Sequence, residues 1–376
     1  MDGSQWMIYG AYGYTGELIA EEALVRGHRP ILAGRSSAQL EPLAERLGLA
    51  HATIDLDDAR GLVEAVGEVG LVLNAAGPFV RTAEPAIRAC LTAGAHYVDI
   101  TGEIAVFQTA FAYDNLARRR RIALLPGAGF DVVPTDCLAN YVVARLPEAT
   151  HLELAFATVG GASPGTLKTA LEGAPDGVRV RRAGTLVSAT SSQYTKLVRF
   201  SDRERCVVAI PWGDLETAYR STGVPNITTY IATTAAGGMR ARLGWSLAQR
   251  LLRRRVVRTA LRRVITAFVR GPDRRTREAG RTYIWACARD SRGQKQEAWL
   301  ETTEAYRFTA AASVRCVERI LEARPSGALT PAQAFGADFV LEIEGTRRYD
   351  VLPGDVGQDM ARRRAGEELC TAIERG

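Results

Sequence analysis

Hydrophobic and polar positions alternate in a regular rhythm over the first third of the chain. The short apolar runs QWMIY, PILA, GLVLN, HYVDI and IALL are separated by segments whose apolar residues recur three or four positions apart, as in TGELIAEEALVRG. Short apolar runs of this kind predict buried strands, and the spacing between them predicts amphipathic helices. A strand and a helix that alternate about every dozen residues indicate an α/β fold. We therefore predict a Rossmann-type, doubly wound parallel sheet.

The rhythm changes in the second part of the chain. From residue 151 on, strand-like runs such as LELAFATV, RVRRAGTLVSAT and CVVAIP follow one another without a regular strand–helix alternation. This pattern predicts a mixed α+β domain, and a strongly helical stretch over 309–324 is expected to return to the first domain. The expected domains are a nucleotide-binding Rossmann domain over 1–146, an α+β substrate or interaction domain over 147–305 that includes a basic helix over 245–270, and C-terminal helices and a strand over 306–376 that pack back on the Rossmann domain.

A glycine-rich loop joins the first predicted strand to the first predicted helix. In IYGAYGYTGELIA, glycines stand at 10, 13 and 16. The first allows a sharp exit from the strand, the second lets backbone approach a diphosphate, and the third lets helix and strand pack closely. A glycine turn without a ligand is the alternative. The predicted cofactor residues of this loop are Gly10, Tyr12, Gly13, Tyr14, Thr15 and Gly16.

Arg35 and Ser36 follow the second predicted strand, nineteen residues beyond Gly16. NAD-binding domains usually place an acidic residue near this point, where it binds the ribose hydroxyls. A carboxylate would repel a 2′-phosphate, whereas a guanidinium and a hydroxyl bind it. The pair predicts NADP(H) rather than NAD(H), with a solvated arginine at a strand end as the alternative.

Further cofactor contacts are predicted where later strands end. Asp55 is placed to accept a hydrogen bond from the adenine amino group or, equally, to cap the next helix. Small residues after the fourth strand leave room for the nicotinamide-side ribose, and a glycine after the sixth strand leaves room for the nicotinamide ring. These predicted cofactor residues are Asn74, Ala75, Ala76, Gly77, Pro78 and Gly129.

Composition limits the remaining classes of protein. The 376 residues are 47% hydrophobic and 24% charged, and the six cysteines include no C-x-x-C pair. We therefore expect reduced, structural cysteines and no metal site. The chain enters its first strand within a few residues of Met1 and contains no apolar run of membrane-spanning length, so a cytoplasmic location is the expectation.

One segment makes the chain basic. The net charge is +6, yet residues 240–277 hold thirteen arginines and one acidic residue, which gives +12 there and −6 elsewhere. Within it, 245–270 has apolar residues at helical spacing and arginines between them. Three interpretations stay open: a solvated face of a core helix, peripheral contact with anionic lipid, or a dock for an acidic carrier protein. Nucleic acid is not expected, because no recognition motif accompanies the arginines.

Candidate proton donors lie near the predicted carboxyl edge of the sheet. A Tyr-x-x-x-Lys pair is absent, because Pro164, Ser192 and Ser291 stand four residues before the three lysines. Ligands bind at the carboxyl ends of strands in such folds, and hydride transfer needs a positioned proton source. Asp99 and Glu103 have an alternative role as caps of the next helix, and Lys168 one as a surface lysine. The predicted catalytic residues are Tyr97, Glu103, Asp131 and Lys168.

The motifs GAYGYTG, GRS, NAAGPF, ACLTAGAHYVDITGE and PGAGFDVVPTD, followed by GTLKTALEG, IPWGDLETAYRSTGVPN, GPDRRTREAGRTYIWACARD and GALTPAQAFG, resemble the saccharopine dehydrogenase-like NADP-binding oxidoreductases. Within that group they resemble the trans-acting enoyl reductases. The resemblance implies a Rossmann domain with an inserted α+β domain and C-terminal helices that pack back on the first domain.

From the cofactor motif and this resemblance we expect an NADPH-dependent reductase of an activated C=C bond in a lipidic or polyketide-like substrate. The substrate is then a small molecule, free or tethered to a carrier protein, and the enzyme is a candidate homo-oligomer. Reduction of an imine (C=N) of the saccharopine or opine type is the alternative reaction. A non-catalytic NADP-binding scaffold is the alternative from another class.

Overall fold

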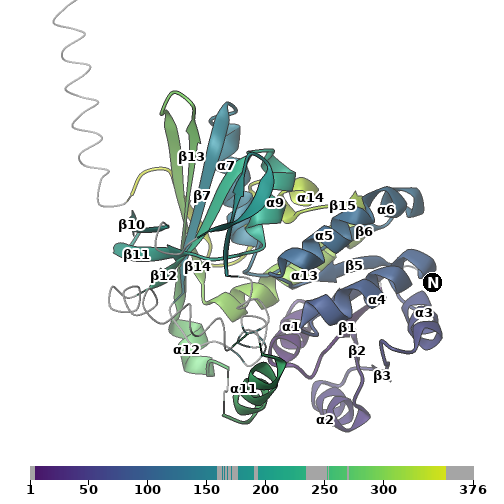
Figure 1. Cartoon of the computed structure of the whole chain (residues 1–376). Coiled ribbons are helices and arrows are strands. Elements are labelled where there is room, and N and C mark those ends of the chain that lie inside the picture. Colours follow the sequence, from purple (N-terminus) through teal and green to yellow (C-terminus); the bar gives the residue numbers. More distant parts are fainter. Residues whose placement is uncertain are drawn as a thin grey trace, which may run out of the picture.

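The structure is a computed structural model that describes residues 5–158, 177–189, 194–233, 254–268 and 271–352, with the single positions 163, 165, 167, 171 and 252. It holds a seven-stranded and a nine-stranded sheet. Figure 1 shows the two sheets beside each other, with the helices of the first part of the chain around the seven-stranded sheet. The predicted donor Lys168 and the start of the basic segment, 245–251, lie outside the described residues.

The first sheet is the predicted Rossmann-type sheet. Its seven strands are all parallel and run in the order β15-β6-β5-β4-β1-β2-β3. The fully buried β4, sequence LVLN, shows why these runs are apolar throughout: helices cover both faces of a parallel sheet. The strands are β1 (Trp6–Tyr9), β2 (Ile31–Gly34), β3 (His51–Thr53), β4 (Leu71–Asn74), β5 (His96–Asp99), β6 (Ala123–Leu125) and β15 (Gly327–Ala328). The helices between them are α1 (Tyr14–Val25), α2 (Ser37–Leu47), α3 (Ala59–Gly67), α4 (Phe79–Ala93), α5 (Ile104–Ala112) and α6 (Asp114–Arg120).

Helix α7 (Val133–Ala144) leads from β6 to the second, mixed sheet. That sheet has nine strands, with the main order β10-β11-β12-β7-β13-β14-β16 and the hairpin β8–β9 beside β12. Most of its neighbours are antiparallel, and β7 and β12 are parallel. Its strands are β7 (Ala149–Thr158), β8 (Val178–Arg182), β9 (Thr185–Ala189), β10 (Thr195–Arg199), β11 (Glu204–Ala209), β12 (Asn226–Thr233), β13 (Arg281–Asp290), β14 (Lys295–Thr303) and β16 (Arg347–Tyr349). Its helices are α9 (Asp214–Thr222), α11 (Arg255–Phe268) and α12 (Arg274–Ala279).

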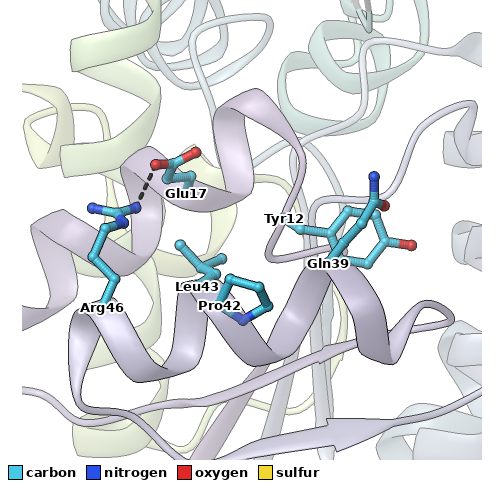
Figure 2. A pocket seen from close by; sticks show the side chains of 6 residues that line it. All are labelled: Tyr12, Glu17, Gln39, Pro42, Leu43 and Arg46. Atoms are coloured by element: carbon cyan, nitrogen blue, oxygen red, sulfur yellow. Dashed lines mark hydrogen bonds and ion pairs between the residues drawn. The ribbon is translucent and has the colours of Figure 1, made fainter.

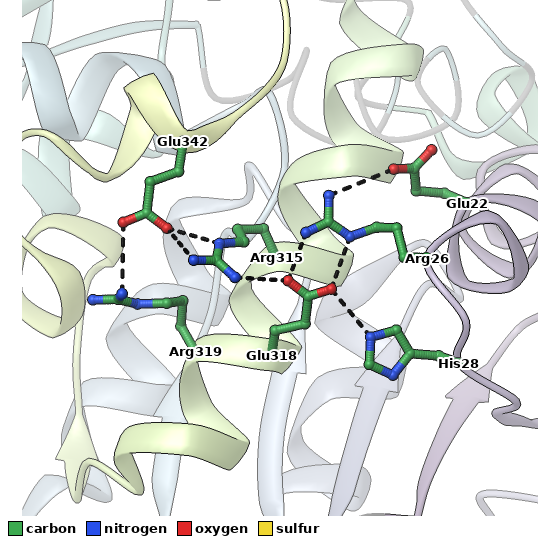
Figure 3. A network of polar contacts seen from close by, with 7 residues as sticks. All are labelled: Glu22, Arg26, His28, Arg315, Glu318, Arg319 and Glu342. Carbon is green, nitrogen blue, oxygen red and sulfur yellow. Dashed lines mark hydrogen bonds and ion pairs between the residues drawn. The ribbon is translucent and has the colours of Figure 1, made fainter.

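Helix α13 (Ala305–Ala323) returns from the second sheet to the first and packs on α1. A charged network fastens this contact, as Figure 3 shows. Glu318 accepts hydrogen bonds from Arg26 at 2.8 and 2.6 Å and from Arg315 at 2.9 Å. Burial works in the opposite direction, but these bonds and one from His28 lower the pKa of Glu318 to about 2. Beyond α13 the chain forms β15, α14 (Pro331–Phe335) and the 3₁₀ helix η3 (Phe339–Glu342), and then adds β16 to the second sheet.

Three observations bear on the remaining expectations from composition. All five cysteines among the described residues are free, and four of them are buried. Within the same residues no group of histidine, cysteine and acidic side chains is arranged to hold a metal ion. None of the described helices combines the length and apolarity needed to cross a bilayer.

Candidate cofactor and active site

The loop after β1 is shaped by close backbone contacts. Gly10 has a φ of +83°, and a Cβ there would lie 2.7 Å from the Cβ of Ala76 in the loop after β4. The N–H groups of Gly10 and Ala11 both donate to the carbonyl oxygen of Ala33, at 2.7 and 3.2 Å. Only glycine adopts this positive φ without strain and also leaves room for the close contact with Ala76. The ends of β1 and β4 therefore meet where the strand order of the sheet reverses, which is the place where such folds bind dinucleotides.

Helix α1 begins directly behind this loop, with Gly13 as its N-cap residue and no side-chain cap. Its first backbone bond runs from Glu17 N to Gly13 O at 2.9 Å, so the N–H groups of Tyr14, Thr15 and Gly16 have no acceptor within the helix. A Cβ at Gly16 would lie 2.3 Å from Gly10 O. The open helix end and the absent Cβ atoms form a cradle whose N–H groups and dipole suit a diphosphate.

The expected 2′-phosphate residues lie at the end of β2. Arg35 is exposed, and within the described residues it makes no hydrogen bond or ion pair. Ser36 is the N-cap residue of α2, and its hydroxyl makes no capping bond. A guanidinium, a hydroxyl and the open start of α2 thus share one rim. This set fits a phosphate ester on the adenosine ribose.

Tyr12 connects the glycine loop to that rim. Its ring lies against Gly34, where a Cβ would be 2.5 Å from ring atom Cε1. It also lines a shallow hollow of about 420 Å³ between α1 and α2. Figure 2 shows Tyr12 and Gln39 at one end of this hollow and the ion pair of Glu17 with Arg46 at the other.

Asp55 does not cap the following helix, which corrects one of its two predicted roles. Asp58 caps α3, because its Oδ1 accepts from Gly61 N at 3.0 Å. Asp55 is exposed, and its Oδ1 accepts from Asp57 N at 3.1 Å within its own turn. Its role toward adenine stays a prediction.

The loop after β4 is held by the buried side chain of Asn74. Its Oδ1 accepts from Ala76 N at 3.0 Å, and its Nδ2 donates to Thr82 Oγ1 at 3.2 Å. The Thr82 hydroxyl in turn donates to Ala76 O at 2.6 Å. Asn74 therefore fixes the small residues Ala75, Ala76, Gly77 and Pro78 at the carboxyl edge of the sheet, and its own contact with cofactor stays a prediction.

Glu103 occupies the N-cap position of α5, but its carboxylate caps a different helix. Oε1 accepts from Phe79 N at 2.9 Å and Oε2 from Val80 N at 2.8 Å, both in the first turn of α4. Glu103 is thus the N-cap residue of α5, as predicted, but its side chain does not cap that helix. A carboxylate held by two N–H groups is a structural clamp first, and its catalytic role stays a prediction.

Tyr97 and Asp99 form a buried pair on β5. The Tyr97 hydroxyl donates to Asp99 Oδ2 at 2.8 Å, and Asn74 Nδ2 lies 3.3 Å from the same hydroxyl. Asp99 Oδ1 accepts from Thr101 N at 3.0 Å and from Gly127 N at 2.9 Å. Burial raises the pKa of Asp99 to about 6, with these bonds opposing it. Both side chains are fully enclosed. The bonds of Asp99 to Thr101 N and Gly127 N hold the loops after β5 and β6 in place.

Asp131 differs from these groups: the residue is half-buried, and its carboxyl has no hydrogen-bond partner among the described residues. Its Oδ2 would lie 2.7 Å from a Cβ on Gly102, and its backbone oxygen accepts from Trp212 Nε1 at 2.8 Å. Burial raises the pKa of Asp131 to about 7, and the charge of Glu103 acts in the same direction. A carboxyl of this kind holds a proton near neutral pH.

Gly129, two residues earlier, lies against α13. A Cβ there would be 2.9 Å from Thr309 Cγ2, and the Thr309 hydroxyl accepts from Phe130 N at 3.0 Å. Helix packing accounts for this glycine, and its predicted contact with the nicotinamide ring is untested.

Asp214 was not predicted as a site residue, although it stands in the quoted motif IPWGDLE. It is 1% exposed, and the Thr135 hydroxyl lies 2.6 Å from its Oδ1. Burial raises its pKa well above the ordinary range, and the nearby Asp136 and Asp131 act in the same direction. The sequence signal that could have identified it is an acidic residue directly after Trp212 and Gly213.

Comparison with known proteins agrees with this geometry. Residues 6–125 match the family model described as the saccharopine dehydrogenase NADP binding domain. The chain resembles a putative trans-acting enoyl reductase of Mycobacterium tuberculosis, with 32% identity over 180 residues that cover 44% of this chain and 43% of the relative. It also resembles the human saccharopine dehydrogenase-like oxidoreductase, with 26% identity over 202 residues and 47% of each chain covered. The chain thus aligns with less than half the length of these relatives.

Among solved structures, apo saccharopine dehydrogenase (L-Glu forming) from Saccharomyces cerevisiae has the same fold. The TM-score is 0.60 at 11% sequence identity, over 92% of this chain and 99% of that chain. The similarity extends the predicted arrangement, a Rossmann-type domain with an inserted mixed sheet, to nearly the whole chain. Residues 6–125 accordingly match a saccharopine dehydrogenase NADP binding domain, and NADP(H) is the cofactor that this domain indicates.

Proposed function

We propose that the protein is an NADPH-dependent reductase that reduces an activated C=C bond, and that Asp131 supplies the proton. The observation that supports this role is the carboxyl of Asp131 at the carboxyl edge of the Rossmann sheet, which has a pKa near 7 and no hydrogen-bond partner among the described residues. A proton donor works best when its pKa lies near the working pH. Tyr97 and Glu103 are engaged by their own neighbours, so Asp131 is the donor that the described residues favour.

The reaction requires a hydride and a proton. When bound, NADPH supplies the hydride to the electron-poor carbon of the double bond and becomes NADP⁺. The carbon next to the activating carbonyl then takes the proton that Asp131 holds on its carboxyl oxygen. The Asp99 carboxylate accepts hydrogen bonds from Thr101 N and Gly127 N and so fixes the loops after β5 and β6. Trp212, in the second domain, donates to the backbone oxygen of Asp131.

The substrate we propose is a lipidic or polyketide-like enoyl thioester, and we propose a carrier protein as its bearer. Two features support this choice: relatives named trans-acting enoyl reductase, and an arginine-rich segment that suits an acidic carrier. On α11 the described side chains of Arg263, Leu261 and Val264 are exposed, which is compatible with such a surface.

The test measures NADPH oxidation with enoyl thioesters, free and attached to an acyl carrier protein, and in parallel with mixtures of amines and 2-oxo acids. Wild type is compared with Asp131→Asn, which keeps the shape and removes the acid, and with Asp57→Asn, an exposed carboxylate as the matched control. We expect turnover of enoyl thioesters that falls at least 100-fold in Asp131→Asn and is unchanged in Asp57→Asn.

Two other results would contradict this proposal. Turnover of amine and 2-oxo acid mixtures alone would assign imine reduction instead. Tight NADPH binding without oxidation by any of these substrates, together with tight carrier or liposome binding, would favour the non-catalytic scaffold.

A further inference from the structure

Tyr14 is the first residue of α1, directly beside the proposed diphosphate cradle. Cα–Cβ bonds in a helix lean toward its N-terminus, so this side chain projects past the start of α1 and not along it. Its ring meets the ring of Tyr306 edge-on, with centroids 5.0 Å apart. Its hydroxyl donates to Pro272 O at 2.6 Å. The glycine loop is thereby joined to a segment that lies 258 residues later in the chain.

Arg277 of α12 completes this contact. Its Nη1 donates to the Tyr14 hydroxyl at 3.0 Å and to Pro272 O at 2.7 Å. Gly271 makes the approach possible, since a Cβ there would lie 2.4 Å from the Tyr14 ring. The second domain thus places a half-buried guanidinium against the side chain of the first residue of α1.

Within the described residues no acidic side chain forms an ion pair with this guanidinium. Its charge acts to lower the pKa of two nearby acidic groups, Asp273 and Glu304. Neither forms an ion pair with Arg277 within the described residues, and Glu304 instead accepts from the N–H groups of Tyr306 and Arg307 at 2.9 and 3.1 Å. In the described part of the chain Arg277 donates through Nη1 alone, which leaves Nε and Nη2 for a ligand. A cation whose bonds within the described residues go only to neutral groups, close to the start of a helix that suits an anion, is suited to neutralise that anion.

We propose that Arg277 is a cofactor-binding residue contributed by the second domain: it contacts the diphosphate of NADP(H), and Tyr14 couples cofactor binding to the seating of the second domain. The cradle supplies N–H groups and a helix dipole but no full positive charge, and Arg277 adds that charge. This inference rests on the NADP-binding domain and not on the identity of the substrate.

The test compares the dissociation constants of ligands that carry different phosphates, measured by fluorescence or calorimetry. NADPH and 2′-phospho-ADP-ribose contain the diphosphate, NADH contains it without the 2′-phosphate, and 2′-AMP contains only the 2′-phosphate. Arg277→Met should weaken the first three by about tenfold, the worth of one charge-assisted hydrogen bond, and leave 2′-AMP unchanged. Arg275→Met, on the exposed face of the same helix, is the control and should change none.

Two further variants separate charge from shape. Arg277→Lys keeps the positive charge but not the fork of N–H donors, so it should weaken NADPH binding less than Arg277→Met does. Tyr14→Phe keeps the ring and removes the hydroxyl link. NADPH should slow amide hydrogen exchange in 272–280 in wild type, and this slowing should be weaker in Tyr14→Phe, where only the direct contact of Arg277 with the diphosphate remains.

The proposal is overturned if Arg277→Met binds NADPH as Arg275→Met does, or if its affinity for 2′-AMP falls by the same factor as for NADPH. The second result would mark a general loss of structure. If Arg277→Met does not fold, the pair of Arg277→Lys and Tyr14→Phe still decides the matter, because exchange protection that is identical in wild type and Tyr14→Phe contradicts the coupling. Since none of these measurements uses turnover, failure of the proposed reaction would leave their result unaffected.

Discussion

Gly10 and Ala76 are packed so closely that a Cβ on the glycine would lie 2.7 Å from the Cβ of the alanine. This contact joins the end of β1 to the loop after β4 and leaves no space for a side chain. The φ of +83° at this residue is a second, separate reason for glycine here. The crevice for the cofactor is therefore built on backbone contact.

Gly10→Ala tests this contact. Crowding and an unfavourable φ should together lower the free energy of unfolding by about 2–4 kcal/mol and weaken NADPH strongly. Gly27→Ala is a matched control, because Gly27 also has a positive φ, +82°, but nothing within 4 Å of a Cβ. It should lose only about 1 kcal/mol. Equal losses in the two variants, measured by urea denaturation, would show that Ala76 does not crowd Gly10.

Glu103→Gln tests whether this carboxylate is a clamp. The amide oxygen can serve only one of the two N–H groups, so the free energy of unfolding should fall by about 1–2 kcal/mol. Glu64→Gln, in an exposed pair with Arg60, should change stability by less than about 0.5 kcal/mol. If Glu103→Gln were as stable as wild type and yet inactive, the chemical role predicted for Glu103 would be correct instead.

Glu318 provides a prediction of pH-dependent stability. Its pKa is about 2 in the folded chain against an ordinary value of 4.5. A lowered pKa stabilises the fold above the ordinary value, and this stabilisation is lost as the pH falls from about 4.5 toward 2. Glu318→Gln should therefore cost about 1–3 kcal/mol at pH 7 and progressively less below pH 4.5. Glu17→Gln, which breaks an exposed pair with Arg46, is the control. A cost that does not change with pH would contradict the network in Figure 3.

Asp131 predicts the pH dependence of turnover. A proton donor must be protonated, so single-turnover NADPH oxidation should be constant below pH 6 and fall about tenfold per pH unit above the pKa near 7. Asp131→Asn should lose this limb together with most of the rate. A rate that rises through pH 7 would exclude Asp131 as the acid.

The Rossmann half of the fold follows closely from local patterns in the sequence. Strands such as LVLN are apolar throughout because both faces of the sheet are covered, and Gly10 is needed where the chain turns next to Ala76. These signals depend on neighbours along the chain or on backbone geometry. The expected rim, Arg35 and Ser36, is likewise set by the end of β2 and the start of α2.

Contacts between distant segments could not be predicted in this way. The Glu103 carboxylate crosses to the start of α4 in place of its own helix, and Arg277 reaches Tyr14 across 263 residues. The sequence offers each of these two side chains several possible hydrogen-bond partners of the same chemical kind. Only the three-dimensional packing determines which partner it contacts. Strand β16 likewise joins the second sheet, although α14 and η3, which precede it in the sequence, pack on α7.

The central claim is that the crevice binds NADP(H) with its 2′-phosphate at Arg35, and equilibrium titration of NADPH and NADH tests it most directly. Wild type should prefer NADPH, and Arg35→Met should weaken NADPH by about 1.5–3 kcal/mol while NADH changes little. Arg60→Met, an exposed arginine on α3, should behave as wild type. Equal affinity for both nucleotides in wild type, or an Arg35→Met variant that keeps the preference for NADPH, would contradict the account.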